Sequence, residues 1–382
     1  MTWTPCSPRC TTRTAPRGSR RRTDTLSTSS SSPHEPGSSG SSSSDRQPPQ
    51  RTVSQAVRAA AAALTAAGVP SAGYDARALM AAALTRETGR ETSVTDLVLR
   101  GGDAAPGSYD GLVDRRVQRE PLQLILGTAP VVGIDLAVGP GVFIPRPETD
   151  LLIEWVADQL SARVAARQDD PRGDGLAPRL AGPRVTVLDL CSGPGTIALG
   201  VACLATQRGL TDSLDLHVIG LEKSPTALEY ARRNLADWVR RGDIDPRVTV
   251  DFHRADVSGP RDLVRLGLVA DADIVVSNPP YVPSTTPVDP EVAADPAEAV
   301  FSGVDGLEMM RPLAQVIALA AAPTSEVAVE HDDTTGPQVR ALLEEAGVGQ
   351  TRQHRDFAGR DRFVSGRVRR DPGYRPTKIK NL

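Results

Sequence analysis

The sequence predicts an α/β protein, built on a mostly parallel sheet with helices on both faces and preceded by a small helical segment. Between residues 185 and 346, short apolar segments typical of strands alternate with segments typical of helices. Such alternation indicates βαβ units and a parallel sheet. The last two extended segments, Gln350–Asp356 and Arg362–Val368, lie too close together for a crossover helix. We therefore expect them to form an antiparallel hairpin at the end of the sheet.

The individual elements of this region follow from local patterns. Strands are predicted over Val185–Leu190, Asp215–Leu221, Val248–His253, Ile274–Ser277 and Glu326–Glu330. Helices are predicted over Thr196–Gln207, Pro225–Arg241, Pro260–Leu266, Gly306–Ala322 and Gly336–Ala346. A further helix over Leu151–Ala166 has Asp150 as its candidate N-cap. The polar residues 167–183, rich in Pro and Gly, predict a surface loop.

The segment ahead of the sheet is predicted to be helical. The expected helices begin at the candidate N-cap Ser54 and run to Ala67, then over Tyr74–Thr85, Val94–Leu99 and Tyr109–Gln118. Two extended pieces around Gly133, Ala129–Val132 and Asp135–Val138, predict a β-hairpin. The expected organisation is a disordered tail at 1–51, a helical domain at 52–120, a hairpin and linker at 121–150, an α/β domain at 151–368 and a flexible tail at 369–382.

Composition excludes several classes of protein. No apolar run approaches the roughly 18 residues of a membrane span, so we expect no membrane insertion. The four cysteines are too few and too scattered for a disulfide scaffold or a four-ligand zinc site, and we expect no metal. The net charge is −3, of which the first 50 residues contribute +4 and the remainder −7. An acidic body argues against stable binding to duplex nucleic acid.

The first 50 residues have the composition of a disordered segment. They hold thirteen serines and almost no apolar residues that could offset the entropy of ordering. A flexible extension or an incorrectly assigned start codon accounts for them most simply. The Arg-rich, Ser-rich and acid-poor composition is also typical of a transit peptide, and the sequence leaves these readings open.

A glycine-containing turn follows the first predicted strand of the sheet. The strand ends with Asp189, and the turn carries Gly193 and Gly195 ahead of a helix. Glycines allow a ligand to approach the backbone, and a helix N-terminus is electropositive. The pattern suits a nucleotide or an amino-acid carboxylate, and Asp189 favours a ligand with an ammonium group. An ordinary βα turn is the structural alternative.

A second acidic residue, Glu222, ends the next predicted strand. In doubly wound folds this position faces the ligand crevice, and a carboxylate with two acceptor oxygens suits the vicinal hydroxyls of a ribose. Taken alone, Glu222 is as readily explained as a solvated surface residue. Its place in the strand after the glycine turn favours the ligand-binding interpretation.

The tetrapeptide Asn278-Pro279-Pro280-Tyr281 directly follows a buried strand. The prolines fix the backbone and remove two N–H donors. What remains is an array of acceptors, the side-chain oxygen of Asn278 and the carbonyl of Pro279, which can hold a planar –NH2 group by both of its hydrogens. Tyr281 offers a flat wall for stacking. Asn-Pro is also a common turn, but the strand context favours the chemical interpretation.

In this tetrapeptide and in several further segments, the chain resembles the HemK/PrmC family of protein-(glutamine-N(5)) methyltransferases, which act on peptide chain release factors. The resemblance covers about residues 53–368. It rests on the tetrapeptide and the Asp189 turn, and on the segments 119–123 (REPLQ), 141–150 (GVFIPRPETD), 295–307 (DPAEAVFSGVDGL), 329–331 (VEH) and 356–362 (DFAGRDR). It implies a class I S-adenosylmethionine-dependent methyltransferase fold, a Rossmann-like seven-stranded sheet, and S-adenosyl-L-methionine as cofactor.

The resemblance also implies residue roles. Asn278, Pro279 and Tyr281 would be catalytic, and Pro280, Phe143 and Arg146 would complete the substrate pocket. The cofactor would contact residues at or near the ends of successive strands: Asp189, Cys191, Ser192, Gly193, Pro194, Gly195, Glu222, Asp256, Val257 and Asn278. Cys191 and Val257 depart from the family, which often has glycine and an aromatic residue there. Val257 is expected to stack less well on adenine.

Three functions compete at this stage. The first is methylation of a glutamine in the Gly-Gly-Gln loop of a release factor, with the helical domain 52–120 recognising that protein. The second is adenine-N(6) methylation of DNA or RNA, which uses the same tetrapeptide but needs a basic recognition domain. The third is a non-catalytic scaffold, which predicts the loss of Asn278 or Glu222, and both are present. We favour the first and expect a cytoplasmic monomer.

Overall fold

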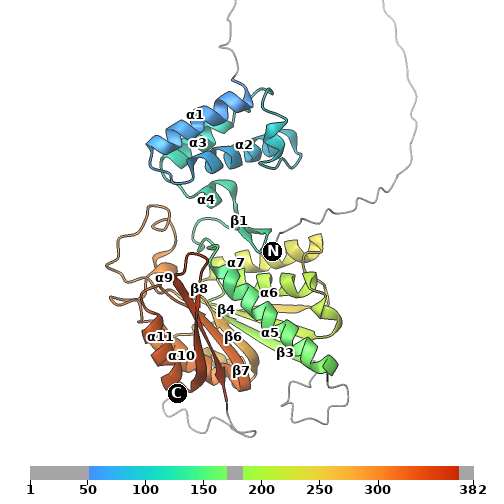
Figure 1. Cartoon of the computed structure of the whole chain (residues 1–382), viewed down its shortest axis with the longest axis vertical. Coiled ribbons are helices and arrows are strands. Elements are labelled where there is room, and N and C mark those ends of the chain that lie inside the picture. The colour runs from blue at the N-terminus through green and yellow to red at the C-terminus, as the bar shows by residue number, and fades with distance from the viewer. Residues whose placement is uncertain (1–50, 170–183, 370–382) are drawn as a thin grey trace, which may run out of the picture. The chain divides into compact units, whose positions relative to one another are not determined.

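A computed structural model describes residues 51–169 and 184–369 of the chain (Figure 1). The tails predicted at 1–51 and 369–382 lie outside these ranges except for Arg51 and Arg369. Most of the loop predicted at 167–183 also lies outside them, and helix α5 (Thr149–Asp169) extends into its first residues.

The main sheet has seven strands in the order β5-β4-β3-β6-β7-β9-β8. Their bounds are β3 Arg184–Leu190, β4 Asp215–Glu222, β5 Thr249–Arg254, β6 Ala272–Ser277, β7 Ala321–Glu330, β8 Val348–Arg355 and β9 Asp361–Val368. The first five strands in this order are parallel, and β9 is antiparallel to both β7 and β8. The predicted fold class and its terminal antiparallel hairpin are therefore confirmed.

Helices cover both faces of this sheet (Figure 1). One face packs against α5, α6 (Thr196–Gln207) and α7 (Pro225–Arg241). The other packs against α8 (Arg261–Arg265), α10 (Met310–Ala320) and α11 (Gly336–Glu345). Strand β3 shows why: Val185 and Val187 belong to the first hydrophobic cluster, whereas Leu188 and Leu190 belong to the second. Side chains alternate along a strand, so a central strand buried on both faces must be apolar throughout.

The N-terminal helices enclose a hydrophobic cluster of their own. They are α1 Val53–Ala66, α2 Ala72–Thr88, α3 Tyr109–Val117 and α4 Leu122–Leu126, with a 3₁₀ turn at Asp96–Val98. The predicted N-cap Ser54 is wrong by two residues. Thr52 caps α1 and forms a capping box with Gln55. The predicted helix Val94–Leu99 shrinks to the 3₁₀ turn, and α4 was not predicted.

A two-stranded hairpin follows, formed by β1 (Thr128–Val131) and β2 (Ile134–Ala137), as predicted. Asn234 of α7 fastens it to the main body. The Asn234 side chain accepts a hydrogen bond from Ala137 N–H at 2.9 Å and donates to Ala137 O at 3.1 Å. Asp150 does not act as the predicted helix cap, because α5 already begins at Thr149 and the Asp150 carboxylate accepts from Val132 N–H.

The region before β7 departs most from prediction. The expected helix Gly306–Ala322 is shorter, because Gly306 has a φ of +74° and lies in the left-handed region. Strand β7 begins at Ala321 rather than Glu326, with an irregularity in its pairing to β6. A short helix, α9 (Ala297–Val300), was not predicted. No described helix is both long and apolar enough to cross a lipid bilayer.

Candidate active site

The candidate site lies at the carboxyl edge of the parallel strands. Asp189 lies near the end of β3, Glu222 ends β4 and Asn278 directly follows β6. Strand β3 pairs with β4 on one side and with β6 on the other, so the chain reverses its direction of winding here. This switch point is where open α/β sheets bind ligands.

The turn after β3 is built from backbone conformations that favour glycine. Gly193 and Gly195 have φ values of +55° and +92°, and Cys191 is held at +61°. A Cβ at Gly195 would lie 2.9 Å from Leu199 Cδ1 and 3.1 Å from Phe252 Cζ. Only glycine fits there without displacing core side chains. The close packing of the turn against the core therefore requires glycine at Gly195, directly before the start of α6.

Asp189 and Ser192 present buried polar atoms with no partner in the described part of the chain. Asp189 is fully buried, and its Oδ2 accepts from Ala198 N–H at 3.1 Å. Its Oδ1 and the Ser192 hydroxyl have no hydrogen-bond partner there. Burial raises the pKa of Asp189 well above its ordinary value, and the charge of Glu222 adds to the effect. Leaving buried polar groups unpaired is costly, so these atoms indicate a ligand.

Glu222 holds the turn in place from the neighbouring strand. Its Oε2 accepts from Gly193 N–H at 2.9 Å, and its Oε1 accepts from Ser224 N–H at 2.7 Å. Each carboxylate oxygen has a second lone pair. Glu222 can therefore support the turn and still accept hydrogen bonds from a diol.

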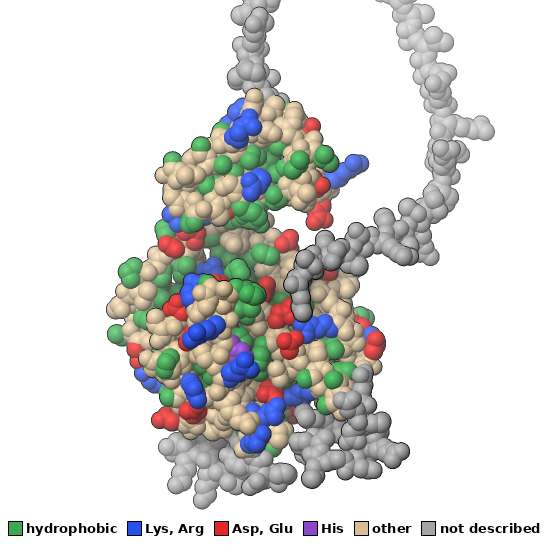
Figure 2. Space-filling view, viewed as in Figure 1, with side chains coloured by type: hydrophobic (Ala, Val, Ile, Leu, Met, Phe, Trp, Pro, Cys, Tyr) green, Lys and Arg blue, Asp and Glu red, His purple; other side chains and the backbone are tan. Residues whose placement is uncertain are grey.

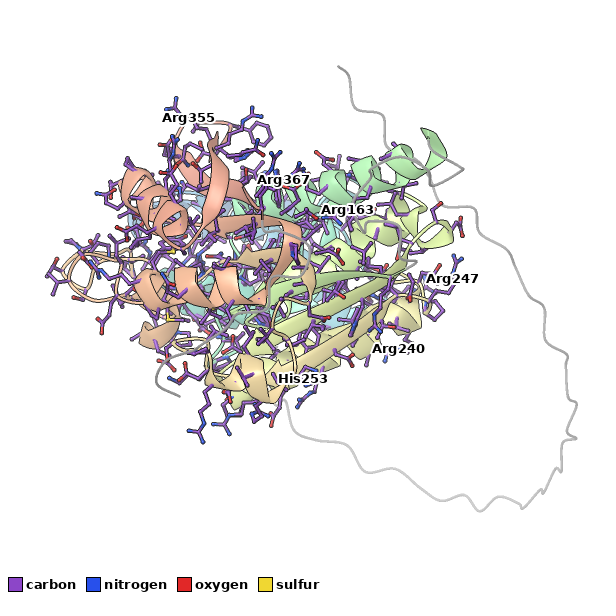
Figure 3. The ribbon with its side chains drawn as sticks, turned by 90° about the horizontal axis from the view of Figure 1, so that it is seen from below. Arg163, Arg240, Arg247, His253, Arg355 and Arg367 are labelled. Atoms are coloured by element: carbon purple, nitrogen blue, oxygen red, sulfur yellow. The ribbon has the colours of Figure 1, made fainter. Side chains whose placement is uncertain are left out.

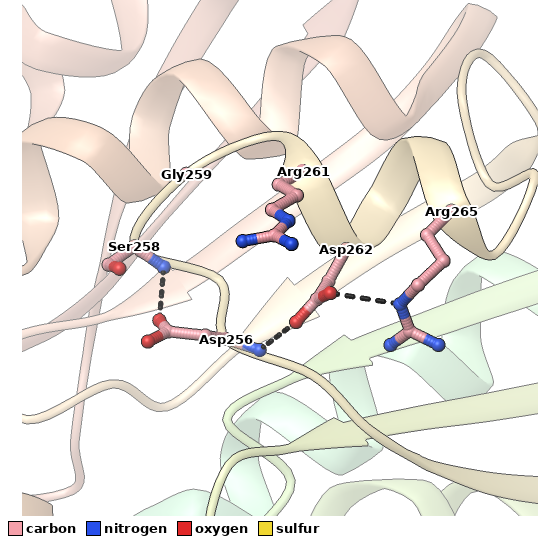
Figure 4. Close-up of a pocket in the computed structure, with 6 residues that line it drawn as sticks. All are labelled: Asp256, Ser258, Gly259, Arg261, Asp262 and Arg265. Carbon is pink, nitrogen blue, oxygen red and sulfur yellow. Dashed lines mark hydrogen bonds and ion pairs between the residues drawn. The ribbon is translucent and has the colours of Figure 1, made fainter. Parts of the chain in front are cut away.

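Asp256 borders a cavity of about 330 Å³ beyond β5, which Figure 4 shows. The other lining residues are Ser258, Gly259, Arg261, Asp262 and Arg265. Asp256 pairs with Lys223 at 2.9 Å and accepts from Ser258 N–H at 2.9 Å. The hydrogen bond from Lys223 is the main reason that the pKa of Asp256 falls to about 2. Val257 is buried against the second core cluster, so its side chain serves packing.

A hydrogen-bonded chain orients the tetrapeptide. Asn278 Nδ2 donates to Thr149 Oγ1 at 3.0 Å, and the Thr149 hydroxyl donates to Glu330 Oε2 at 3.0 Å. On the other side, the Tyr281 hydroxyl donates to Glu330 Oε1 at 3.1 Å. Because this hydrogen bond engages the amide nitrogen of Asn278, the side-chain oxygen is the atom left to accept a further hydrogen bond.

Glu330, at the end of β7, accepts the last hydrogen bond from each side of this network. Burial raises the pKa of Glu330 to about 7, although the hydrogen bonds from Thr149 and Tyr281 lower it. Burial also raises the pKa of Tyr281 well above its ordinary value, and the neighbouring Glu330 contributes to that rise. Tyr281 is therefore a neutral hydrogen-bond donor rather than a base.

Residues 300–306 hold the segment after the tetrapeptide in place by hydrogen bonds and close packing. Val282 N–H donates to Val300 O and Ser302 N–H donates to Val282 O, each at 2.9 Å. A Cβ at Gly306 would lie 2.4 Å from the carbonyl oxygen of Tyr281. The 295–307 segment thus supports the tetrapeptide and the residue after it. It needs glycine at position 306, where it comes closest to the Tyr281 carbonyl.

Phe143 and Arg146 lie together in the loop before α5. The guanidinium carbon of Arg146 is 5.1 Å from the centre of the Phe143 ring, a cation–π distance. Asp295 is buried, forms an ion pair with Arg146 and accepts from Ile144 N–H at 3.0 Å. Asp295 therefore ties the loop that carries Phe143 to the segment that follows the tetrapeptide.

Sequence reasoning missed Thr149, Glu330 and Asp295 as site residues. Each lies inside a segment that carries the family resemblance, at 141–150, 329–331 and 295–307 respectively. An acid or hydroxyl residue within such a segment was the sequence feature that could have indicated a site residue. Among the described residues, no group of three or more His, Cys, Asp or Glu side chains is arranged to hold a metal ion.

Comparison with known proteins gives the family. Residues 55–127 match the model of the PrmC N-terminal domain. The release factor glutamine methyltransferase of Corynebacterium glutamicum is 36% identical over 83% of this chain and 99% of its own length. The chain belongs to the release factor glutamine methyltransferase family. The member from Mycolicibacterium smegmatis is 39% identical over 81% of this chain and 95% of its own length, and the HemK/PrmC resemblance is thereby confirmed. A solved protein-(glutamine-N5) methyltransferase (release factor-specific) from Alicyclobacillus acidocaldarius is 20% identical over 61% of this chain and 99% of its own, with a TM-score of 0.31.

Proposed function

We propose that this methyltransferase transfers a methyl group from S-adenosyl-L-methionine to the side-chain amide nitrogen of a glutamine, in the Gly-Gly-Gln loop of a peptide chain release factor. The observation that carries the proposal is the hydrogen bond from Asn278 to Thr149. It leaves the Asn278 oxygen and the Pro279 carbonyl as paired acceptors for an –NH2 group. The names of the relatives supply the substrate.

The residues around the glycine turn fit S-adenosyl-L-methionine. The unpartnered Asp189 Oδ1 and Ser192 hydroxyl suit the amino-acid part of the cofactor. Glu222 would accept from the ribose hydroxyls. Asp256, with Val257 beside it, would meet the adenine amino group, and the turn from Cys191 through Gly193 and Pro194 to Gly195 would face the methionine part. When bound, the cofactor supplies a methyl group on a positively charged sulfonium.

The chain's own contribution to the chemistry is positioning. An amide nitrogen is a poor nucleophile because its lone pair is delocalised into the carbonyl. When Asn278 Oδ1 and the Pro279 carbonyl accept both N–H hydrogens, electron density shifts toward nitrogen. Pro280 fixes the backbone of this array, and Tyr281 and Phe143 would wall the pocket. A methylated amide loses its extra proton readily, so solvent can take it. Preorganised dipoles would then account for most of the rate gain.

Arg146 supports the substrate pocket through its ring contact with Phe143. We further propose the division into a helical segment at 52–120, a hairpin and linker at 121–150 and a catalytic domain at 151–368. In this division the helical segment recognises the protein substrate. Two ion pairs join that segment to the loop that follows the tetrapeptide, because Arg116 and Arg119 of the helical segment contact Glu291 at 2.8 and 2.6 Å.

Adenine-N(6) methylation of nucleic acid remains the second candidate, because it needs the same acceptor pair. Charge argues against it. The face in Figure 2 mixes acidic and basic side chains. All five arginines labelled in Figure 3 form ion pairs with acidic partners, namely Arg163, Arg240, Arg247, Arg355 and Arg367. Paired arginines on mixed surfaces are poor phosphate contacts.

The test is a methyl-transfer assay with labelled cofactor on two substrates, a purified release factor and duplex DNA. We expect label on the release factor only, and none when the glutamine of its Gly-Gly-Gln loop is replaced. Label on DNA at a comparable rate would favour the second candidate. A release-factor substrate also implies action in the cytoplasm, where translation ends.

A further inference from the structure

Phe357 is displayed to solvent at the tip of the β8–β9 hairpin. Its side chain is 100% exposed, the highest value among the large apolar side chains that the structure describes. The chain has only five phenylalanines, so this exposure uses a scarce residue. A single exposed apolar residue needs no explanation by itself. Two further properties of Phe357 do call for an explanation. The turn that carries it is ordered, and it lies near the candidate site.

The turn that carries Phe357 is braced from within. The Asp356 carboxylate accepts from Ala358 N–H and Arg360 N–H, each at 2.9 Å, and from Arg362 Nε at 3.0 Å. Asp356 N–H donates to Arg360 O at 2.9 Å, and Gly359 has a φ of +82°. The ring is therefore presented by an ordered turn, and a partner would gain contact area at little cost in backbone entropy.

The turn lies at the edge of the sheet that carries the candidate site. Strand β9 runs antiparallel to β7 with Phe363 opposite Glu330, so the tip of the hairpin projects beyond the carboxyl end of β7 (Figure 1). Arg360 and Arg362 reach Glu148 at 3.5 and 3.6 Å. Glu148 directly precedes Thr149, which orients Asn278. The turn that carries Phe357 is thus linked through these two arginines to the segment beside the proposed glutamine pocket.

We propose that Phe357 is a docking residue for the folded protein substrate, which it contacts outside the glutamine loop. The inference rests on the proposed function and extends it to a second contact surface. A convex, fully exposed ring cannot enclose a small molecule, but it can insert into an apolar recess of a protein. Aromatic side chains are enriched among the residues that dominate protein interfaces. The occupant is therefore an apolar surface patch of the release factor beside its Gly-Gly-Gln loop.

The test compares Phe357→Ala with the unchanged protein on two substrates, an intact release factor and a short peptide that contains Gly-Gly-Gln. We expect kcat/KM on the intact factor to fall roughly tenfold, the usual scale for truncating an interface anchor. The loss should appear in KM, with kcat at saturating factor within about twofold. Affinity for the factor without cofactor should fall in parallel, whereas cofactor affinity and peptide methylation should not change.

Two further variants serve as controls for Phe357→Ala. Phe357→Leu keeps an apolar anchor and should recover most of the affinity. Val239→Ala is a matched control, because Val239 is an exposed apolar residue near the end of α7, and it should behave like the unchanged protein. Folding of each variant is checked by thermal unfolding, and self-association by sedimentation.

Three results would overturn the inference while leaving the proposed function intact: no change with Phe357→Ala, a loss of kcat rather than a rise in KM, or a loss of self-association instead of factor binding. If the unchanged protein methylates neither the factor nor the peptide, the proposed function itself fails. The two failures are therefore distinguishable.

Discussion

The side-chain nitrogen of Asn278 donates a hydrogen bond of 3.0 Å to the hydroxyl of Thr149, which lies 129 residues earlier in the chain. Thr149 in turn donates to Glu330, so both of its hydrogen-bonding roles are fixed. An asparagine amide can be turned either way about its last bond. This contact selects the orientation that leaves the Asn278 oxygen as the acceptor for the proposed substrate.

Thr149→Val should therefore impair turnover without weakening cofactor binding. The substitution keeps the shape of the side chain but leaves the Asn278 amide and a Glu330 oxygen without a partner. Unmade hydrogen bonds of this kind cost about 1–3 kcal/mol each, so we expect kcat to fall by roughly tenfold to a hundredfold. Thr149→Ser should retain most activity. Steady-state kinetics and calorimetric titration with cofactor measure the two effects, and equal loss of cofactor affinity would contradict this role.

Activity should rise with pH through about 7. The raised pKa of Glu330, about 7, means that its carboxylate forms only near neutral pH. The ionised form accepts from both Thr149 and Tyr281, whereas protonation places a donor where an acceptor is needed. In Glu330→Gln the step near pH 7 should vanish and turnover should be low throughout. A pH–rate profile checks this, and an unchanged step in the variant would assign it to another group.

The raised pKa of Glu330 also predicts how the free energy of unfolding changes with pH. Because burial raises the pKa of Glu330 from 4.5 to about 7, the folded state holds a proton that the unfolded state releases between these values. The stability contributed by this group is therefore fully present below about pH 4.5 and is lost as pH rises toward 7. Denaturant unfolding across this range should show a smaller decline in Glu330→Gln. An identical decline in both proteins would contradict the linkage.

Glu222→Ala should weaken cofactor binding by tenfold or more. The substitution removes acceptors for the ribose hydroxyls, and hydrogen bonds to a charged group are worth about 1.5–3 kcal/mol each. It also frees Gly193 N–H in the turn. Glu229→Ala, a change of an exposed acid on α7, is the matched control. Calorimetry that finds the same dissociation constant in Glu222→Ala as in the unchanged protein would place the ribose elsewhere.

Cys191→Gly should not destabilise the protein, although it removes a side chain. Cys191 is held at a φ of +61°, and this conformation costs a non-glycine residue about 1–2 kcal/mol. Glycine relieves that strain, so the free energy of unfolding should stay the same or rise. A β-branched substitution, Cys191→Val, should lower it. If urea unfolding shows that Cys191→Gly loses more than about 1 kcal/mol, packing of the thiol outweighs the strain.

Local sequence patterns were enough to predict the sheet, but they did not predict the long-range contacts that form the candidate site. The apolar run of β3 and the acids on β3 and β4 were visible in sequence, because a buried strand and its functional end are contiguous. The start of β7 at Ala321 was missed because its first residues, up to Ser325, are largely small or polar and alternate poorly. Thr149 and Glu330 meet across 181 residues, and no local pattern reports a contact of that kind.

The central claim, that Asn278 presents the glutamine amide for methylation, is tested most directly by one measurement. Release factor is incubated with labelled S-adenosylmethionine and either the unchanged protein, Asn278→Ala or Asn278→Asp, and the modified residue is located by mass spectrometry. We predict one methyl group on the Gly-Gly-Gln glutamine with the unchanged protein. Turnover should fall by about a hundredfold or more in Asn278→Ala, the usual cost of one preorganised polar group. It should fall less in Asn278→Asp, and both variants should retain cofactor binding. Methylation of the same glutamine at the native rate by Asn278→Ala would contradict the account.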